Sequence, residues 1–217
     1  MQTLRILLLL SSMLLAALPA YALDDPKVAR AKYDELAAKV LSGDLNIDWQ
    51  ALRLDARVGE VYGEYDPYDA AKRTQAAFEK GNYEEALKIA LETEKHNVAD
   101  IEAHVAAWSS LKQLGRKREA DKEWSIFQAL VQSILKSGDG KSAKTAWFAV
   151  GIREEFVFME MPLQVQYKQQ RSVKQDGHYY DMVLVTDKSG KDAVLWFNTD
   201  TDIELNGRAG DEGHHIY

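Results

Sequence analysis

Gly81-Asn82-Tyr83-Glu84-Glu85-Ala86-Leu87 and Gly115-Arg116-Lys117-Arg118-Glu119-Ala120-Asp121 are two stretches of this sequence that begin 34 residues apart. In register, Gly81 pairs with Gly115, and Ala86 pairs with Ala120. Glycine permits the tight turn that joins two antiparallel helices, and alanine lets the helices approach closely. The two stretches therefore predict two consecutive helical hairpins between Pro67 and Leu135.

The 34-residue period resembles that of tetratricopeptide repeats, in which each unit is one helical hairpin. The resemblance is partial, because the large and small residues typical of the first helix are replaced by Arg73 and Thr74 in one copy, and by Ala107 and Trp108 in the other. An alternative is that each phrase is an ordinary capped helix start. The prediction of helical hairpins does not depend on the family name.

Two helices are predicted before the hairpins. Between Asp25 and Leu41 the apolar residues recur at intervals of three to five positions, which is typical of an amphipathic helix. Between Asn46 and Val61 the apolar residues again share one side, and Asp48 is placed to cap this second helix.

The pattern changes to one of strands after Ser137-Gly138-Asp139-Gly140. Predicted elements are a buried strand at Ala146–Val150, a short helix or irregular strand at Glu154–Met161, and strands at Val165–Val173, His178–Thr186 and Asp192–Phe197. The last three are separated by Asp176-Gly177 and Lys188-Ser189-Gly190, whose residues tolerate the positive φ of tight hairpin turns.

These elements predict an α+β fold in which N-terminal helices and two tetratricopeptide-like helical hairpins pack on a C-terminal antiparallel β-meander of three to four strands. We expect a helical region over residues 23–142, a β region over 143–206 and a mobile tail over 207–217. Repeat arrays usually need about three units for stability. We therefore expect the N-terminal helices and the sheet to cap the two hairpins.

Several phrases outside the repeat are similar to a bacterial family, the domain of unknown function 4919. These phrases are Tyr65-Asp66-Pro67-Tyr68, Gly81-Asn82-Tyr83, Leu135-Lys136-Ser137-Gly138-Asp139-Gly140-Lys141-Ser142, Asp176-Gly177-His178-Tyr179-Tyr180-Asp181 and Trp196-Phe197-Asn198. The resemblance implies an order of elements and no activity.

Residues 1–22 have the composition of a secretory signal peptide: a positive charge at Arg5, an apolar run, and small residues at Ala20 and Ala22. The run is too short and too interrupted to span a membrane. We expect cleavage between Ala22 and Leu23 and a periplasmic or secreted protein. The chain has no cysteine, which excludes a disulfide and a lipid-modified cysteine.

The charge balance argues against nucleic acid as a partner. The chain carries 27 Lys and Arg residues against 34 Asp and Glu residues, for a formal charge of −7, and loss of Arg5 would make it more negative. Binding to phosphates requires a basic face. The densest basic stretch, Arg116-Lys117-Arg118, is followed at once by Glu119.

Two short motifs suggest ligands and have simpler interpretations. Gly140-Lys141-Ser142 resembles the end of a phosphate-binding loop, but Leu135 stands where the first glycine belongs and the loop follows a helix, so we interpret it as a helix terminator. Asp211, Glu212, His214 and His215 could offer metal ligands, but ordering a tail opposes tight binding. We predict no cofactor and no resident metal.

One enzymatic hypothesis remains, a small periplasmic hydrolase with its site where helices meet the sheet. Its polar residues would be Glu154, Glu155, His178 and Asp181. Alternation along a strand places His178 and Asp181 on opposite faces, which opposes a direct pairing of base and carboxylate.

The leading hypothesis is a non-enzymatic module or scaffold that binds a protein or peptide partner, as helical repeat arrays do. Its groove would use aromatic residues of the hairpins, for which the candidates are Tyr83, Trp108 and Trp124. The alternative is that these aromatic side chains only pack between helices. The sequence predicts no oligomeric state.

Overall fold

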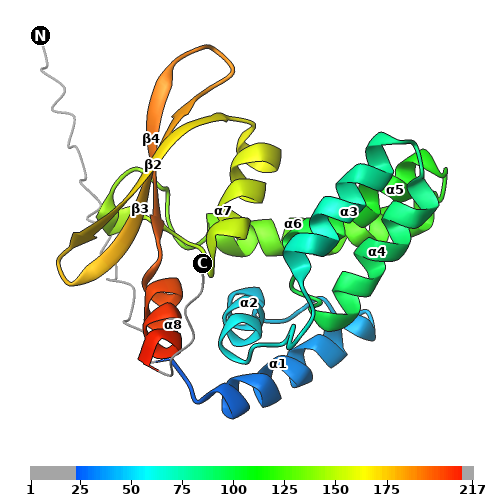
Figure 1. The fold of residues 1–217 in the computed structure, drawn as a ribbon, viewed down its shortest axis with the longest axis horizontal. Coiled ribbons are helices and arrows are strands. Elements are labelled where there is room, and N and C mark those ends of the chain that lie inside the picture. The colour runs from blue at the N-terminus through cyan, green and yellow to red at the C-terminus, as the bar shows by residue number, and fades with distance from the viewer. Residues whose placement is uncertain (1–22, 212–217) are drawn as a thin grey trace, which may run out of the picture.

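The computed structural model describes residues 23–211, so the predicted signal peptide lies outside the described residues. Six helices come first along the described chain, and the sheet follows them (Figure 1). The helices are α1 (Pro26–Leu41), α2 (Trp49–Val58), α3 (Pro67–Glu79), α4 (Tyr83–His96), α5 (Ile101–Gln113) and α6 (Lys117–Leu135). The later elements are β1 (Trp147–Phe148), α7 (Ile152–Phe158), β2 (Gln166–Gln175), β3 (His178–Thr186), β4 (Asp192–Asn198) and α8 (Asp200–Asp211), with a 3₁₀ turn at Ala143–Thr145 and a π-helical turn at Met159–Leu163.

The two predicted N-terminal helices are present and are capped as the sequence indicates. The Asp25 side chain accepts a hydrogen bond from the backbone N–H of Lys27 at the start of α1, and Asp48 accepts one from Ala51 at the start of α2. Each carboxylate satisfies an amide that would otherwise lack a partner in the first turn.

The two helical hairpins are confirmed as α3–α4 and α5–α6, with each helix contacting the next one along the chain. Gly81 and Gly115 turn the chain with φ of 74° and 71°, values that favour glycine. Ala86 and Ala120 are both buried where the helices meet. Figure 1 shows α3, α4 and α5 grouped at one end of the molecule, whereas α6 runs from that end toward α7 and the sheet.

The α+β class is confirmed, and the sheet is mixed rather than wholly antiparallel. Its strand order is β1-β4-β3-β2. The strands β2, β3 and β4 form the predicted antiparallel meander, whereas β1 pairs with β4 in parallel. Asp176 and Gly177, with φ of 53° and 91°, form the tight turn between β2 and β3.

One hydrophobic core joins the region expected at 23–142 to the region expected at 143–206. Leu130 and Ile134 of α6 are fully buried in the same cluster as Trp147 of β1, Phe158 of α7 and Phe197 of β4. The rings of Trp147 and Phe158 meet edge to face with centroids 4.9 Å apart. The helices and the sheet are therefore parts of one folded body.

The C-terminal helix α8 is a feature that the sequence patterns did not indicate. It begins with Asp200 and Asp202 in its first turn, where acidic side chains complement the helix dipole. It continues to Asp211, so residues 207–211, expected to be a mobile tail, are helical. Glu212, His214 and His215 lie outside the described residues. Among the described helices, none is long and apolar enough to cross a membrane.

Candidate functional site

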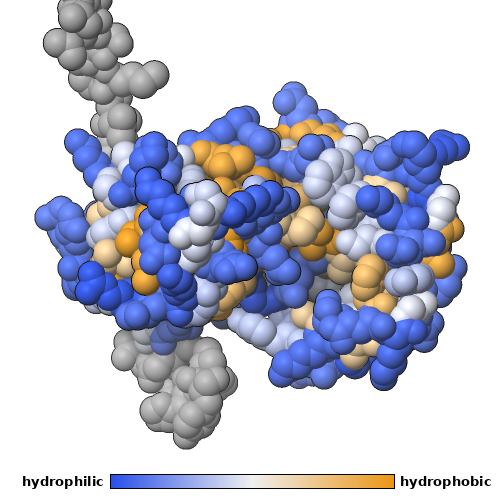
Figure 2. All heavy atoms as spheres, turned by 90° about the horizontal axis from the view of Figure 1, so that it is seen from above, coloured by the Kyte–Doolittle hydropathy of each residue, from blue (hydrophilic) through white to orange (hydrophobic). Residues whose placement is uncertain are grey.

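A cavity of about 240 Å³ lies between the two hairpins and α7. Its walls come from the first helix of each hairpin, α3 and α5, and from α7 with the π-helical turn; α4 contributes two residues. The lining residues are Pro67, Ala71, Thr74, Gln75, Phe78, Ala90, Thr93, Glu102, Ala103, Val105, Ala106, Ser109, Arg153, Val157, Glu160 and Met161. Seen from above, apolar residues reach the surface in the middle of the molecule, with hydrophilic residues around them (Figure 2).

Helical periodicity explains why these residues share one cavity. On α3 the lining positions are 67, 71, 74, 75 and 78, and on α7 with its extension they are 153, 157, 160 and 161. Residues three, four and seven positions apart lie on one face of a helix. Small side chains at Ala71, Ala106 and Ser109 leave the space between these faces open.

Arg153 of α7 forms a polar wall of the cavity. Its Nη2 donates to Glu102 Oε2 at 2.7 Å, and its Nη1 donates to Asp100 Oδ2 at 3.1 Å. Its guanidinium also lies 5.3 Å from the centroid of the Tyr68 ring. These contacts tie α7 to α5, so the orientation of α7 over the hairpins is fixed by charge as well as by packing.

The lining side chains determine what chemistry the cavity offers. Most of its lining side chains are apolar or small, and the residues that line it include no histidine and no cysteine. The hydroxyl groups of the lining belong to Thr74, Thr93 and Ser109, and no lining imidazole stands beside them as a base. An apolar cavity with a few polar groups at its edge is typical of sites that recognise side chains.

The aromatic residues predicted to form a groove do not line this cavity. Trp108 and Trp124 pack on each other between α5 and α6, with ring centroids 4.6 Å apart. Tyr83 lies edge-on against Phe78, with centroids 5.1 Å apart, and Phe78 is itself a lining residue. These three aromatic side chains thus pack between neighbouring helices, and other residues of α4 and α5 line the cavity.

Three of the four residues of the hydrolase hypothesis have separate partners. Glu154 forms an ion pair with Arg53 of α2. Asp181 accepts hydrogen bonds from Gln170 and Ser172 of the neighbouring strand β2. His178 Nδ1 lies 2.6 Å from Asp200 Oδ2, so its carboxylate partner belongs to α8 and is not Asp181.

Glu155 is the fourth of these residues and is fully buried. Neither of its carboxyl oxygens has a hydrogen-bond partner among the described residues. Burial, together with the negative charges of the neighbouring Asp181, Asp202 and Glu154, raises its pKa to about 9. Glu155 is therefore a neutral carboxylic acid at pH 7.

The Gly140-Lys141-Ser142 loop uses its amides internally. The backbone N–H groups of Asp139 and Gly140 both donate to the Thr145 carbonyl, and that of Lys141 donates to the Asp139 side chain. A phosphate-binding loop instead directs such amides at the ligand. The contacts fit the interpretation of the loop as a helix terminator.

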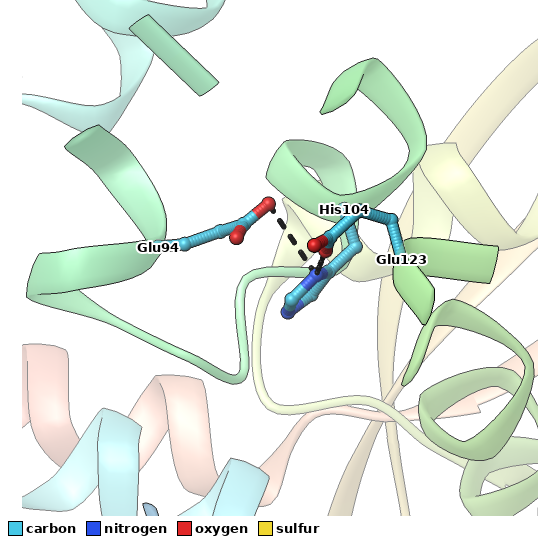
Figure 3. A group of neighbouring side chains, drawn as sticks. All are labelled: Glu94, His104 and Glu123. Atoms are coloured by element: carbon cyan, nitrogen blue, oxygen red, sulfur yellow. Dashed lines mark hydrogen bonds and ion pairs between the residues drawn. The ribbon is translucent and has the colours of Figure 1, made fainter. Parts of the chain in front are cut away.

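A second polar site, not predicted from the sequence, lies where α4, α5 and α6 meet. It consists of Glu94, His104 and Glu123, one residue from each helix (Figure 3). His104 Nδ1 lies 2.7 Å from Glu123 Oε2 and 3.4 Å from Glu94 Oε1. The other ring nitrogen, Nε2, lies 2.9 Å from the Val98 carbonyl oxygen. We call these three side chains the Glu–His–Glu cluster.

Burial and charge act in opposite directions on the cluster. Burial lowers the pKa of His104, but the Glu94 charge and the Glu123 hydrogen bond outweigh it and raise the pKa to about 9. Burial raises the pKa of Glu94 to about 7. In the absence of another ligand, His104 is thus an imidazolium that donates to Glu123 and to Val98.

A sequence signal for this cluster exists on α6. Glu123 lies three positions after the buried Ala120 and four before the buried Phe127, on the apolar face of its helix. On α5, His104 lies three positions before the buried Ala107 and seven before the buried Leu111, so it is also on the apolar face of its helix. An acidic residue and a histidine on facing apolar stripes indicate a buried polar pair, but no contiguous motif contains both residues.

Comparison with known proteins identifies a family. The model of a family described as a domain of unknown function, DUF4919, matches residues 60–206. This range includes the cavity residues and the Glu–His–Glu cluster. No curated protein and no solved structure matches the chain significantly.

Proposed function

The chain belongs to the family of the domain of unknown function DUF4919, and because that description names no activity, we propose a function from the geometry. The proposal is an exported, non-enzymatic module that binds a segment of a protein or peptide partner. The observation that carries it is the cavity between α3, α5 and α7, which the first helices of both hairpins line together.

The size and lining of the cavity fit one or two apolar side chains of a partner. Complete burial of such a side chain contributes about 1.5 to 3 kcal/mol. Thr74, Gln75 and Ser109 place polar groups among the apolar lining, where they can meet the partner's backbone. The expected ligand is therefore a short segment with small or medium apolar anchors.

Selection from a peptide display library tests this proposal, because it supplies a defined probe. The blocking variant is Ala71→Trp, which fills the cavity from α3. The matched control is Ala76→Trp, an exposed position on the same helix that does not line the cavity. We expect enriched peptides to bind the unmodified protein and Ala76→Trp alike, and to bind Ala71→Trp at least about tenfold more weakly.

Two results count against the binding module. One is that selection enriches no peptide over an unrelated protein; the other is that Ala71→Trp binds the enriched peptides as well as Ala76→Trp does. The hydrolase alternative gains no support from the contacts, because Glu154, Asp181 and His178 each have another partner and Glu155 is sealed in the core.

Export is a separate part of the proposal and rests on the sequence of residues 1–22 alone. Expression of the whole chain in a bacterium, followed by fractionation and intact-mass measurement, tests it. We expect a protein that begins at Leu23 outside the cytoplasm. An Ala22→Trp variant should remain uncleaved, because signal peptidase accepts only small residues there. Cytoplasmic protein that retains residues 1–22 argues against export.

A further inference from the structure

The Glu–His–Glu cluster has no role in the binding cavity, and its geometry is that of a set of metal ligands. Each of its residues offers one ligand atom, and the three atoms all lie within 4.8 Å of one another. Figure 3 shows both carboxylates directed at the same nitrogen of the imidazole. We propose that Glu94, His104 and Glu123 bind a divalent transition-metal ion of the Zn²⁺ type.

The orientation of the imidazole supports this assignment. His104 Nε2 lies 2.9 Å from the Val98 carbonyl oxygen, which can only accept a hydrogen bond, so the Nε2 proton is fixed. The lone pair available to a metal is therefore on Nδ1, the nitrogen that faces both carboxylates. A backbone carbonyl that fixes the tautomer in this way is the usual outer contact of a metal-bound histidine.

The separations of the ligand atoms also fit. Tetrahedral ligands about 2.1 Å from an ion are about 3.4 Å apart. His104 Nδ1 and Glu94 Oε1 already have that separation, 3.4 Å. His104 Nδ1 and Glu123 Oε2 are 2.7 Å apart, so insertion of the ion requires the Glu123 carboxylate to move by less than about 1 Å.

The burial of the ligand side chains gives an independent reason. The Glu94 Oε1 atom is buried and has no hydrogen-bond partner among the described residues. His104 is 1% exposed, and the Glu123 side chain is 8% exposed. A buried carboxylate oxygen without a partner is costly, and a bound cation would remove that cost.

The ion would join the hairpins to each other. Glu94 belongs to α4 of the first hairpin, whereas His104 and Glu123 belong to α5 and α6 of the second. The Glu94 side chain is 13% exposed, so the site lies just beneath the surface and an ion can enter beside it. With three protein ligands, the fourth position is left for water.

Titration of the metal-free protein with Zn²⁺ and with Co²⁺ tests the proposal, with Mg²⁺ as the comparison ion. We expect one equivalent of Zn²⁺ to bind and to raise the melting temperature, because only the folded chain presents the three ligands together. Co²⁺ should give the visible absorption bands of a four- or five-coordinate site. Mg²⁺ should give no shift, since it prefers six oxygen ligands.

The diagnostic variant is Glu94→Gln, which removes a ligand but leaves the hydrogen bond between His104 and Glu123. Its matched control is Glu92→Gln on the same helix, which removes an exposed carboxylate that pairs with Lys95 and His96. We expect Glu94→Gln to weaken Zn²⁺ binding by at least about 100-fold. Glu92→Gln should bind Zn²⁺ as the unmodified protein does.

The proposal is overturned if the unmodified protein binds neither Zn²⁺ nor Co²⁺ with one-to-one stoichiometry, a result that needs no variant. It is also overturned if Glu94→Gln binds Zn²⁺ undiminished, or if only Glu92→Gln loses binding. If Glu94→Gln loses Zn²⁺ binding, its near-ultraviolet circular dichroism spectrum shows whether the variant is still folded and has therefore lost only a ligand.

Discussion

Arg53 of α2 and Glu154 of α7 form a buried two-pronged ion pair, with Nε 2.8 Å from Oε1 and Nη2 2.5 Å from Oε2. Arg53 is 1% exposed and also donates to Ser133 of α6 and to the Phe148 carbonyl of β1. This one guanidinium therefore connects four elements of the fold.

Replacement of Arg53 by Met should lower the free energy of unfolding by about 3 to 5 kcal/mol, because it leaves Glu154 charged, buried and unpaired. The double variant Arg53→Met with Glu154→Gln should recover much of that loss. Urea unfolding measures both. The control is Arg73→Met, which breaks an exposed pair with Asp69 and should cost at most about 1 kcal/mol. Equal losses at the two arginines would contradict the buried-pair account.

Glu155 should make the protein less stable as pH rises. Its folded-state pKa of about 9 exceeds the ordinary value of 4.5, so between these values the unfolded chain ionises and the folded chain does not. The free energy of unfolding therefore falls across this window, by at most about 1.4 kcal/mol per pH unit. The charged groups that face Glu155 are Asp181 of β3, Asp202 of α8 and Glu154.

The variant Glu155→Gln stays neutral at every pH and isolates this effect. Near pH 5 it should be about as stable as the unmodified protein, and at pH 7 it should be more stable by up to about 3 kcal/mol. Urea unfolding at several pH values makes the comparison. Parallel pH dependences for the two proteins would show that Glu155 is not the group responsible.

Gly140 should tolerate no side chain. Its φ is 65°, and a Cβ atom placed there would lie 2.3 Å from two ring carbons of Trp147. We expect Gly140→Ala to cost about 2 to 4 kcal/mol, from backbone strain and displacement of the ring. Gly115→Ala is the matched control, because its φ is 71° with no atom within 4 Å of the added Cβ, and it should cost about 1 kcal/mol. Thermal unfolding followed by tryptophan fluorescence measures both losses of stability. Similar losses for the two variants would show that contact with the Trp147 ring does not add to the cost at Gly140.

Deletion of residues 143–217 should unfold the helical hairpins. The deletion exposes Leu130 and Ile134 of α6, which are fully buried in the core that includes Trp147, Phe158 and Phe197. Exposure of large core side chains costs about 1.5 to 3 kcal/mol each, which is comparable to the whole stability of a small domain. Circular dichroism should show no cooperative melt. A sharp transition in the shortened chain would mean that the hairpins are stable alone.

Local features of the fold could be read from the sequence because their signals are contiguous. The Gly81 and Gly115 turns, the Asp25 and Asp48 caps and the Asp176-Gly177 hairpin each depend on the conformational preference of one or two residues. These local preferences do not depend on contacts with distant parts of the chain, so the sequence alone indicates them.

The sites depend on contacts between distant residues, and no local pattern specifies those. Arg53 and Glu154 are 101 positions apart, and the partner of His178 is Asp200, 22 positions away, rather than the nearer Asp181. The prediction of an aromatic groove depends on residue type alone. The cavity instead depends on small residues such as Ala71 and Ala106, which leave space between the helices. Periodicity alone does not distinguish a small residue that fits a contact from one that leaves a cavity.

The parallel pairing of β1 with β4 sets an order in which the chain can fold. Trp147 is registered with Phe197, fifty residues further on, whereas the helical hairpins and the β-meander close over short distances. Contacts between distant residues form slowly, because a long loop must close before they are gained. The helices and the meander can therefore assemble early, and the β1–β4 seam that joins them through Trp147 becomes the late step of folding.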